Sequence, residues 1–163
     1  MQKITPFLWF DSRAEEAANY YVSVFKNSEI KTVVRYPESA EAIAGKPAGS
    51  VMTVEFELEG ELFTALNGGK VPGFEFSSAT SFVISCDDQA EIDHYWEKLS
   101  AVPEAEQCGW CKDKFGITWQ IVPKVLSQML SDPDQAKVER VTACFMPMKK
   151  LDIAALQAAY GQK

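Results

Sequence analysis

The chain has 163 residues, of which 47% are hydrophobic and 24% charged, the balance of an ordinary globular protein. Its formal charge is −7 and no stripe of Lys and Arg is present, so we expect no nucleic-acid partner. No apolar run reaches the roughly 18 residues that a membrane span needs, and the first residues show no signal peptide. We therefore expect a cytoplasmic protein with no membrane partner.

The first pattern in the chain is a strand followed by an amphipathic helix. Thr5–Asp11 reads as a buried strand that ends in an acidic residue. Ser12 and Glu15 have the spacing of a capping box, which predicts that Ser12 caps the helix. The expected buried face of that helix recurs with helical spacing and consists of Ala14, Ala17, Ala18, Tyr21, Val22 and Phe25.

Three further strands are expected before the first module closes. Ile30–Tyr36 is rich in β-branched residues. Ser50–Leu58 alternates apolar and polar residues, and a tight turn at Glu59–Glu61 returns the chain into Leu62–Leu66. The polar face of this segment includes Thr53, Glu55 and Glu57. The first module is therefore predicted to be β-α-β-β-β.

The same pattern then returns. Ser81–Asp87 is again a strand that ends in an acidic residue, and Asp88 with Glu91 forms a second capping pair. The apolar face of the following helix consists of Ile92, Tyr95, Trp96 and Leu99. We infer one design used twice, with a first module over residues 1–79 and a second over residues 80–163.

The second module is one strand short after its helix. A hairpin is expected from Glu106–Lys112 and Ile117–Val122. Arg140–Met148, in which Val141, Ala143 and Phe145 alternate with polar residues, could supply the remaining strand. Helices are expected on either side of it, at Lys124–Ser131 and Asp152–Tyr160.

Two loops are candidates for ligand lids, although loops of this kind also simply vary. They are Pro37–Gly49 and Asn67–Gly73.

The four cysteines and the single histidine give no familiar catalytic pattern. Cys108 and Cys111 form a CxxC motif, but it runs into a hairpin strand and lacks the helix N-terminus that activates a redox thiol. A zinc site needs two more ligands at motif spacing, and Cys86 and Cys144 are solitary. His94 lies on the edge of the buried face of its helix, so we favour structural roles for all five residues.

Four tryptophans could line a pocket for a planar ligand or pack the core. Trp9, Trp96 and Trp119 fall on strands or on a buried helix face, which favours the core. Trp110 stands beside a turn, where we expect it to be partly exposed.

Several segments together resemble the PhnB-like family of the vicinal oxygen chelate superfamily, which includes glyoxalase, bleomycin-resistance protein and extradiol dioxygenase. The resemblance spans nearly the whole chain and rests on Thr5–Asp11, Ala14–Ala17 with Tyr20 and Tyr21, Ala65–Gly69, Gly109-Trp110 with Lys112-Asp113, Phe115-Gly116, Trp119–Pro123 and Met146–Leu156. Cys111 departs from the family pattern, because the family more often has an apolar residue at this position. Members are often labelled 3-demethylubiquinone 3-methyltransferase, but this sequence has no glycine-rich strand-to-helix loop to hold a methyl donor.

The resemblance implies an α+β fold of paired βαβββ modules, each forming a cupped mixed sheet, and a homodimer. It also implies a divalent metal held at four positions, which fall near Ile4 or Pro6, near Ala65 or Asn67, at Ser81 and at Gln120. No His, Glu or Asp stands clearly at any of them, and neutral amides and hydroxyls are weak ligands for transition metals. We therefore expect no protein-held metal and no cofactor.

We interpret the chain as a metal-free binder of a small molecule, with no demonstrated catalysis. The expected ligand-binding residues are Leu8, Phe10, Phe63, Asn67, Ser81, Trp110 and Gln120. Asn67 and Gln120 would orient the ligand by hydrogen bonds while the aromatic residues exclude water. Two alternatives stay open. One is a metal-dependent or methyltransferase-labelled enzyme on a small oxygenated substrate, whose metal or cofactor arrives with that substrate or which uses acid–base groups. The other is a structural dimer module with a filled cavity.

Overall fold

The computed structural model describes residues 2–162, and its contacts divide the chain into two units, residues 1–75 and 76–163. We call them unit 1 and unit 2 and describe each by itself. The division falls a few residues before the boundary expected at 79/80. Within residues 2–162, every helix is too short or too polar to cross a lipid bilayer.

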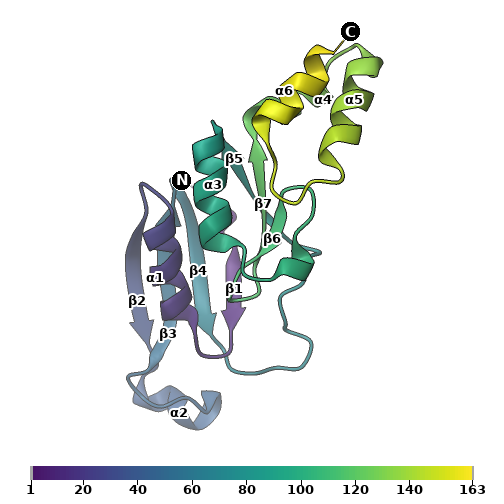
Figure 1. Ribbon diagram of the computed structural model, residues 1–163. Helices are drawn as coiled ribbons and strands as arrows, with labels where there is room; N and C mark the ends of the chain where they lie inside the picture. Colours follow the sequence, from purple (N-terminus) through teal and green to yellow (C-terminus); the bar gives the residue numbers. More distant parts are fainter. Residues whose placement is uncertain (1, 163) are drawn as a thin grey trace. The chain divides into compact units, whose positions relative to one another are not determined.

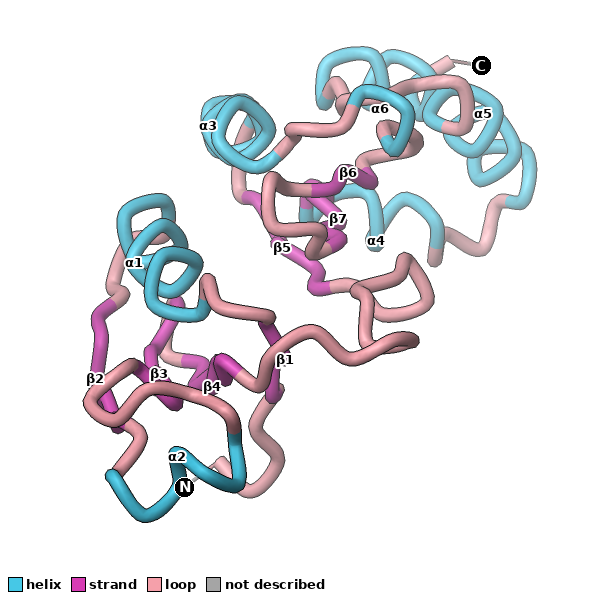
Figure 2. The backbone as a smooth tube through the Cα atoms, turned by 90° about the horizontal axis from the view of Figure 1, so that it is seen from below, coloured by secondary structure: helices cyan, strands magenta, loops and turns pink. Residues whose placement is uncertain are grey.

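Unit 1 is a four-stranded mixed sheet with one helix packed on one face (Figures 1 and 2). Its elements are β1 (Phe7–Phe10), α1 (Ala14–Val24), β2 (Glu29–Arg35), α2 (Glu38–Ala44), β3 (Val51–Leu58) and β4 (Glu61–Asn67). The strand order is β1-β4-β3-β2, with β1 parallel to β4 and the other pairs antiparallel. The predicted strands and hairpin are confirmed.

The core of unit 1 lies between α1 and the sheet. The predicted helix face is buried apart from Val22, and its alanines bring the helix backbone close to the strands. Tyr21 of α1 stacks on Phe56 of β3 with ring centroids 6.2 Å apart, and Phe56 stacks on Phe63 of β4 at 5.5 Å. These contacts fix which face of each strand the helix covers.

The start of α1 differs from the prediction. Ser12 does not cap the helix; the residue before the first turn is Arg13, which makes no side-chain capping bond. The amide of Ala14 instead donates to Oδ1 of Asn67, at the end of β4, over 2.7 Å. The capping-box pattern was therefore wrong here, because a side chain distant in sequence occupies the place that Ser12 was expected to take.

The loop expected at Pro37–Gly49 contains the short helix α2. None of its residues is buried, and Ile43 is 90% exposed. Lys46, just after it, donates from Nζ to the carbonyl of Asp11 over 3.1 Å. The helix therefore adds little to the core.

Unit 2 repeats the strand, helix and hairpin with fewer strands. It contains β5 (Phe82–Cys86), α3 (Gln89–Leu99), a turn of 3-10 helix at Pro103–Ala105, β6 (Trp110–Lys112) and β7 (Thr118–Pro123). The order is β5-β7-β6, with β5 parallel to β7, and α3 lies against one face (Figures 1 and 2). The second capping pair is confirmed: Glu91 N–H donates to Asp88 over 2.9 Å, and Asp87 N–H donates to the Glu91 carboxylate over 2.8 Å.

The expected strand at Arg140–Met148 is wrong, because residues 140–145 belong to helix α5 (Gln135–Phe145) and the rest of the segment follows the end of that helix. Asp134 caps α5 by accepting from the amide of Ala136 at 3.0 Å. The flanking helices are confirmed as α4 (Lys124–Leu130) and α6 (Ile153–Gly161). Unit 2 therefore keeps a three-stranded sheet and continues into helices.

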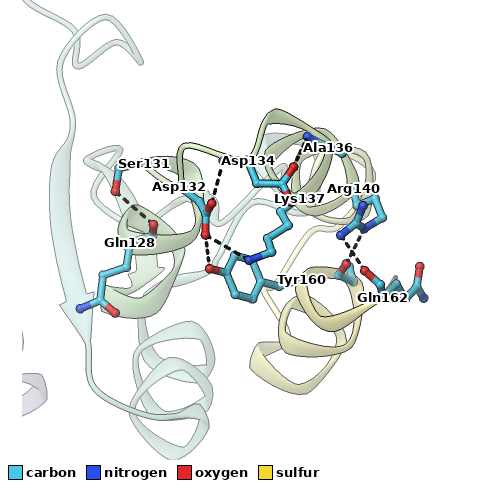
Figure 3. Close-up of polar contacts among 10 residues, drawn as sticks. Gln128, Ser131, Asp132, Asp134, Ala136, Lys137, Arg140, Tyr160 and Gln162 are labelled. Carbon is cyan, nitrogen blue, oxygen red and sulfur yellow. Dashed lines mark hydrogen bonds and ion pairs between the residues drawn. The ribbon is translucent and has the colours of Figure 1, made fainter.

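The three C-terminal helices share a small core of their own. It consists of Leu126, Met129, Val141, Leu151 and Leu156. Polar contacts hold the helices from outside (Figure 3): the hydroxyl of Tyr160 donates to Asp132, and Lys137 lies 3.5 Å from the same carboxylate. Arg140 donates to the carbonyls of Ala159 and Gln162 at the end of α6.

Candidate ligand-binding faces

Each sheet has one face covered by its helix and one face that the helix does not cover. In unit 1 the covered face carries the buried side chains, and the alternate side chains of the same strands are half-buried or exposed. We call the second set the open face of unit 1. It comprises Phe7, Trp9, Thr53, Glu55, Glu57, Leu62, Thr64 and Leu66.

The four predicted ligand-binding residues of unit 1 lie on the covered face. Leu8, Phe10 and Phe63 are buried under α1 and belong to the core. Asn67 is 8% exposed, and besides accepting from Ala14 it donates from Nδ2 to the carbonyl of Val51 over 3.1 Å. The structure thus gives Asn67 a capping role that joins three elements, and its contact with a ligand stays a prediction.

Trp9 is the largest side chain on this open face, and backbone contacts fix it. Its indole N–H donates to the carbonyl of Gly69 over 2.9 Å, and the ring of Phe74 meets it edge-on with centroids 5.0 Å apart. The ring also lies directly on Gly68, where a Cβ atom would come within 2.2 Å of it. The Ala65–Gly69 segment therefore needs a glycine at 68 to seat the tryptophan.

The charges on the open face of unit 1 are unequally matched. Lys31 of β2 pairs with Glu29 at 2.6 Å and with Glu57 at 3.1 Å, and hydrogen bonds to these two carboxylates raise the pKa of Lys31. Glu55 has no hydrogen-bond or ion-pair partner within residues 2–162. The alternation of β3 places Glu55 on the polar side of the strand, outside the four positions at which the resemblance implies metal ligands.

The open face of unit 2 brings together the other three predicted residues. Gln120 of β7 donates from Nε2 to the hydroxyl of Ser81 over 2.9 Å, and Trp110 of β6 lies opposite Gln120 in the register. Val83 of β5, beside Gln120, is 60% exposed. Lys112 follows on the same face and has no side-chain partner in the described part of the chain. Whether Ser81, Trp110 and Gln120 contact a ligand stays a prediction.

The internal repeat relates the two open faces position by position. Aligning the last residues of β1 and β5, Phe10 and Cys86, places Phe7 of unit 1 on Val83 of unit 2. Their neighbours on the parallel partner strands, Thr64 and Gln120, then also correspond. Phe7 is 59% exposed, so the equivalent positions share both apolar character and exposure.

The CxxC motif forms a turn and a strand. Cys108 and Gly109 occupy the left-handed region, with φ of 51° and 83°, and bridge Gln107 to Trp110. The Cys108 thiol donates to the carbonyl of Met146 over 2.9 Å. Burial, followed by the nearby carboxylates, raises the pKa of Cys111 to about 12, which is the opposite of what a redox nucleophile needs.

His94 lies on the exposed side of α3, with its ring 5.1 Å from that of Tyr95. It is on the exposed surface of α3 and not on the open face of unit 2.

The residues available on the open faces fit a divalent metal poorly. Ser81 and Gln120 stand at two of the positions where the resemblance implies metal ligands, and they offer a hydroxyl and an amide. Among residues 2–162, no three His, Cys, Asp or Glu side chains gather closely enough to hold a metal ion. Such ions are usually held by several imidazole, carboxylate or thiolate ligands.

The repeated strand–helix–hairpin units, each a mixed sheet with a helix on one face, have the module fold of the vicinal oxygen chelate superfamily. Within it, the chain belongs to the family described as 3-demethylubiquinone-9 3-methyltransferase, whose model matches residues 2–122. This is the PhnB-like family that the sequence resembled.

Solved structures agree with this assignment. A PhnB protein from Bacillus cereus, described with the same methyltransferase name, is 34% identical and covers 75% of this chain and 99% of its own, with a TM-score of 0.62. Protein PA1353 from Pseudomonas aeruginosa is 17% identical, covers 76% of this chain and 98% of its own, and has a TM-score of 0.54, which supports the fold alone. A comparison with curated proteins gave no match.

Proposed function

We propose that the chain binds a small molecule on the open faces of its sheets, without a metal held by its own side chains. The observation that carries this proposal is the pair of exposed apolar residues at equivalent positions, Phe7 at 59% and Val83 at 60%. Leaving apolar area in water costs roughly 25 cal/mol per Å². A repeated exposure of this kind, beside hydrogen-bonding side chains, is the composition expected of a ligand-binding surface.

The name of the family describes methyl transfer, which needs a methyl donor. The connections from β1 to α1, residues 11–13, and from β5 to α3, residues 87–88, contain no glycine. A loop that brings its backbone against a donor's nucleotide-like body usually relies on glycine for that approach. The residues present therefore support binding better than methyl transfer.

We further propose that the chain forms a homodimer. β1 and β5 are edge strands, each paired only with one neighbour within residues 2–162. Exposed strand edges are normally covered in folded proteins, and pairing with a second copy would cover them. The mass in solution, measured by light scattering, would be twice that of one chain.

The binding proposal can be tested with the neutral dye Nile red, whose fluorescence rises in apolar surroundings. Phe7→Ser and Val83→Ser should each weaken dye binding, because each removes exposed apolar surface from an open face. Ile43→Ser is the matched control: Ile43 is 90% exposed but lies on α2, outside both faces. Equal loss in the control, or no dye binding by the wild type, would count against the proposal.

Metal titration tests the second half of the proposal. Tryptophan fluorescence should show no stoichiometric, tight binding of nickel, zinc or manganese. Such binding would instead support a metal-dependent enzyme.

A further inference from the structure

We propose that the open face of unit 1 takes a cationic ligand, an ammonium or guanidinium group joined to an apolar body, with Glu55 as its counter-ion. This inference rests on the binding function proposed above and names the chemical class of the ligand.

The carboxylates on this face are unequally paired. Glu57 and Glu29 share Lys31, at 3.1 and 2.6 Å, so each of them already has a cationic partner within the protein. Glu55 lies on the same strand as Glu57 and faces the same side, yet it has no partner within residues 2–162. A half-buried carboxylate without a partner gives up part of its hydration without compensation, and a bound cation would supply that compensation.

The position of Glu55 in the sheet also favours a ligand with two different ends. It stands on the middle strand β3, opposite Thr64 of β4 and Thr32 of β2. Thr64 lies in turn beside Phe7 of β1. One row across the sheet therefore offers two hydroxyls, one carboxylate and one exposed aromatic ring, which suits a ligand with a charged and an apolar end.

The neighbouring row of the sheet contains an aromatic side chain, Trp9. Trp9 pairs with Leu66 in the register, and its ring is held in place through Gly69 and Gly68. A fixed indole costs no ordering on binding, and aromatic faces attract cations. A carboxylate ligand, by contrast, would meet Glu55 with its own charge, while Lys31 is already occupied.

The experiment compares three probes of the same shape: 3-phenylpropylamine, 3-phenylpropanol and 3-phenylpropionate. Amide chemical shifts in the full-length protein report both affinity and location. The amine should bind most tightly and shift the amides of β1, β3 and β4. Glu55→Gln should weaken amine binding by about fivefold, the upper range for a partly exposed charge pair, and should leave the alcohol unchanged.

Glu57→Gln is the matched control, because it makes the same change in net charge on the same strand. Since Glu57 is paired with Lys31, this variant should change amine affinity by less than about twofold. Unchanged amide dispersion in both variants would show that each one folds.

The outcomes separate the two proposals. If the alcohol or the carboxylate binds unit 1 as tightly as the amine, or if both variants weaken the amine equally, the cation inference fails while the binding function stands. If none of the three probes binds the wild type, both fail.

Discussion

The two units satisfy the same structural requirement over very different distances in sequence. Each begins with a strand and a helix, and each helix must find an acceptor for its first amides. In unit 2 the acceptor is local: Asp88 accepts from Glu91 three residues ahead. In unit 1 it comes from Asn67, 53 positions from Ala14. A repeated fold therefore need not repeat the contacts that hold it.

The hairpins of the two units also differ, and here it is unit 2 that depends on a buried side chain. In unit 1 the β3–β4 turn is formed by backbone conformation alone. Glu59 and Gly60 lie in the left-handed region, between the paired residues Leu58 and Glu61. In unit 2 the β6–β7 turn surrounds Asp113, which is only 1% exposed. The sheet with fewer strands thus depends on a buried side-chain carboxylate where the larger sheet depends on backbone conformation.

Replacing Asp113 should have the largest effect on the free energy of unfolding. Its carboxylate accepts from the amides of Phe115 and Ile117 at 2.8 and 3.0 Å and from the indole of Trp119 at 2.7 Å. Asp113→Asn sets an amide N–H₂ against one of these donors, which should cost about 3 kcal/mol in the free energy of unfolding. Urea unfolding measures the loss.

Trp119→Phe removes the indole donor and tests whether the cost of Asp113→Asn comes from an opposed donor. In the double variant with Asp113→Asn, the cost should be smaller than the sum of the two single costs, because the opposed donor is gone. Simple additivity would contradict the assigned role of the carboxylate.

Replacing Asn67 should have the second-largest effect on the free energy of unfolding. Asn67→Ala removes the acceptor for Ala14 and the donor for Val51 together, leaving two buried backbone groups unsatisfied. We expect a loss of about 2 kcal/mol in the free energy of unfolding. Hydrogen exchange should locate the loss in α1 and β4, and protection in unit 2 should stay as in the wild type.

The matched change in unit 2 is Asp88→Ala, which removes the local cap of α3. This cap is exposed to solvent, so its loss should cost about 1 kcal/mol. Thermal unfolding of Asp88→Ala and Asn67→Ala, measured side by side, checks this difference. Equal losses of stability in the two variants would contradict it.

The sequence predicted what local patterns determine and missed what distant contacts determine. The cap at Asp88, the buried face of α1 and the β3–β4 hairpin all follow from spacings within a few residues. The alternation of Val141, Ala143 and Phe145 was too short to separate strand from helix. Packing of α5 against α6, reinforced by the bonds from Arg140 to the end of α6, decides the matter in the folded chain.

The sequence did not show which side of the sheet of unit 1 is covered by its helix, for a related reason. β1 is apolar on both sides, as Phe-Leu-Trp-Phe, so its sequence does not show which alternate side chains α1 will cover. Only the register with β4 and the burial of Leu8 and Phe10 reveal that Phe7 and Trp9 face outward. In unit 2 the polar residues Ser81 and Gln120 marked the open side directly.

The smallest expected effect concerns a region that has no counterpart in unit 1, the C-terminal helices. The hydrogen bond from Tyr160 lowers the pKa of Asp132, and the same bond raises the pKa of Tyr160 (Figure 3). A lowered carboxyl pKa stabilises the fold above its ordinary value, and this contribution disappears as the pH falls through the lowered pKa. A raised phenol pKa stabilises the fold below its ordinary value, and this contribution disappears as the pH rises through the raised pKa.

Tyr160→Phe should therefore lower the melting temperature by a small, constant amount between about pH 5 and pH 9, with the difference shrinking at both extremes. Tyr36→Phe is the control, because its hydroxyl donates to the backbone carbonyl of Asn67, which does not titrate. Its effect should stay constant down to acid pH, where that of Tyr160→Phe declines. Parallel acid profiles for the two variants would show that Asp132 does not act through Tyr160.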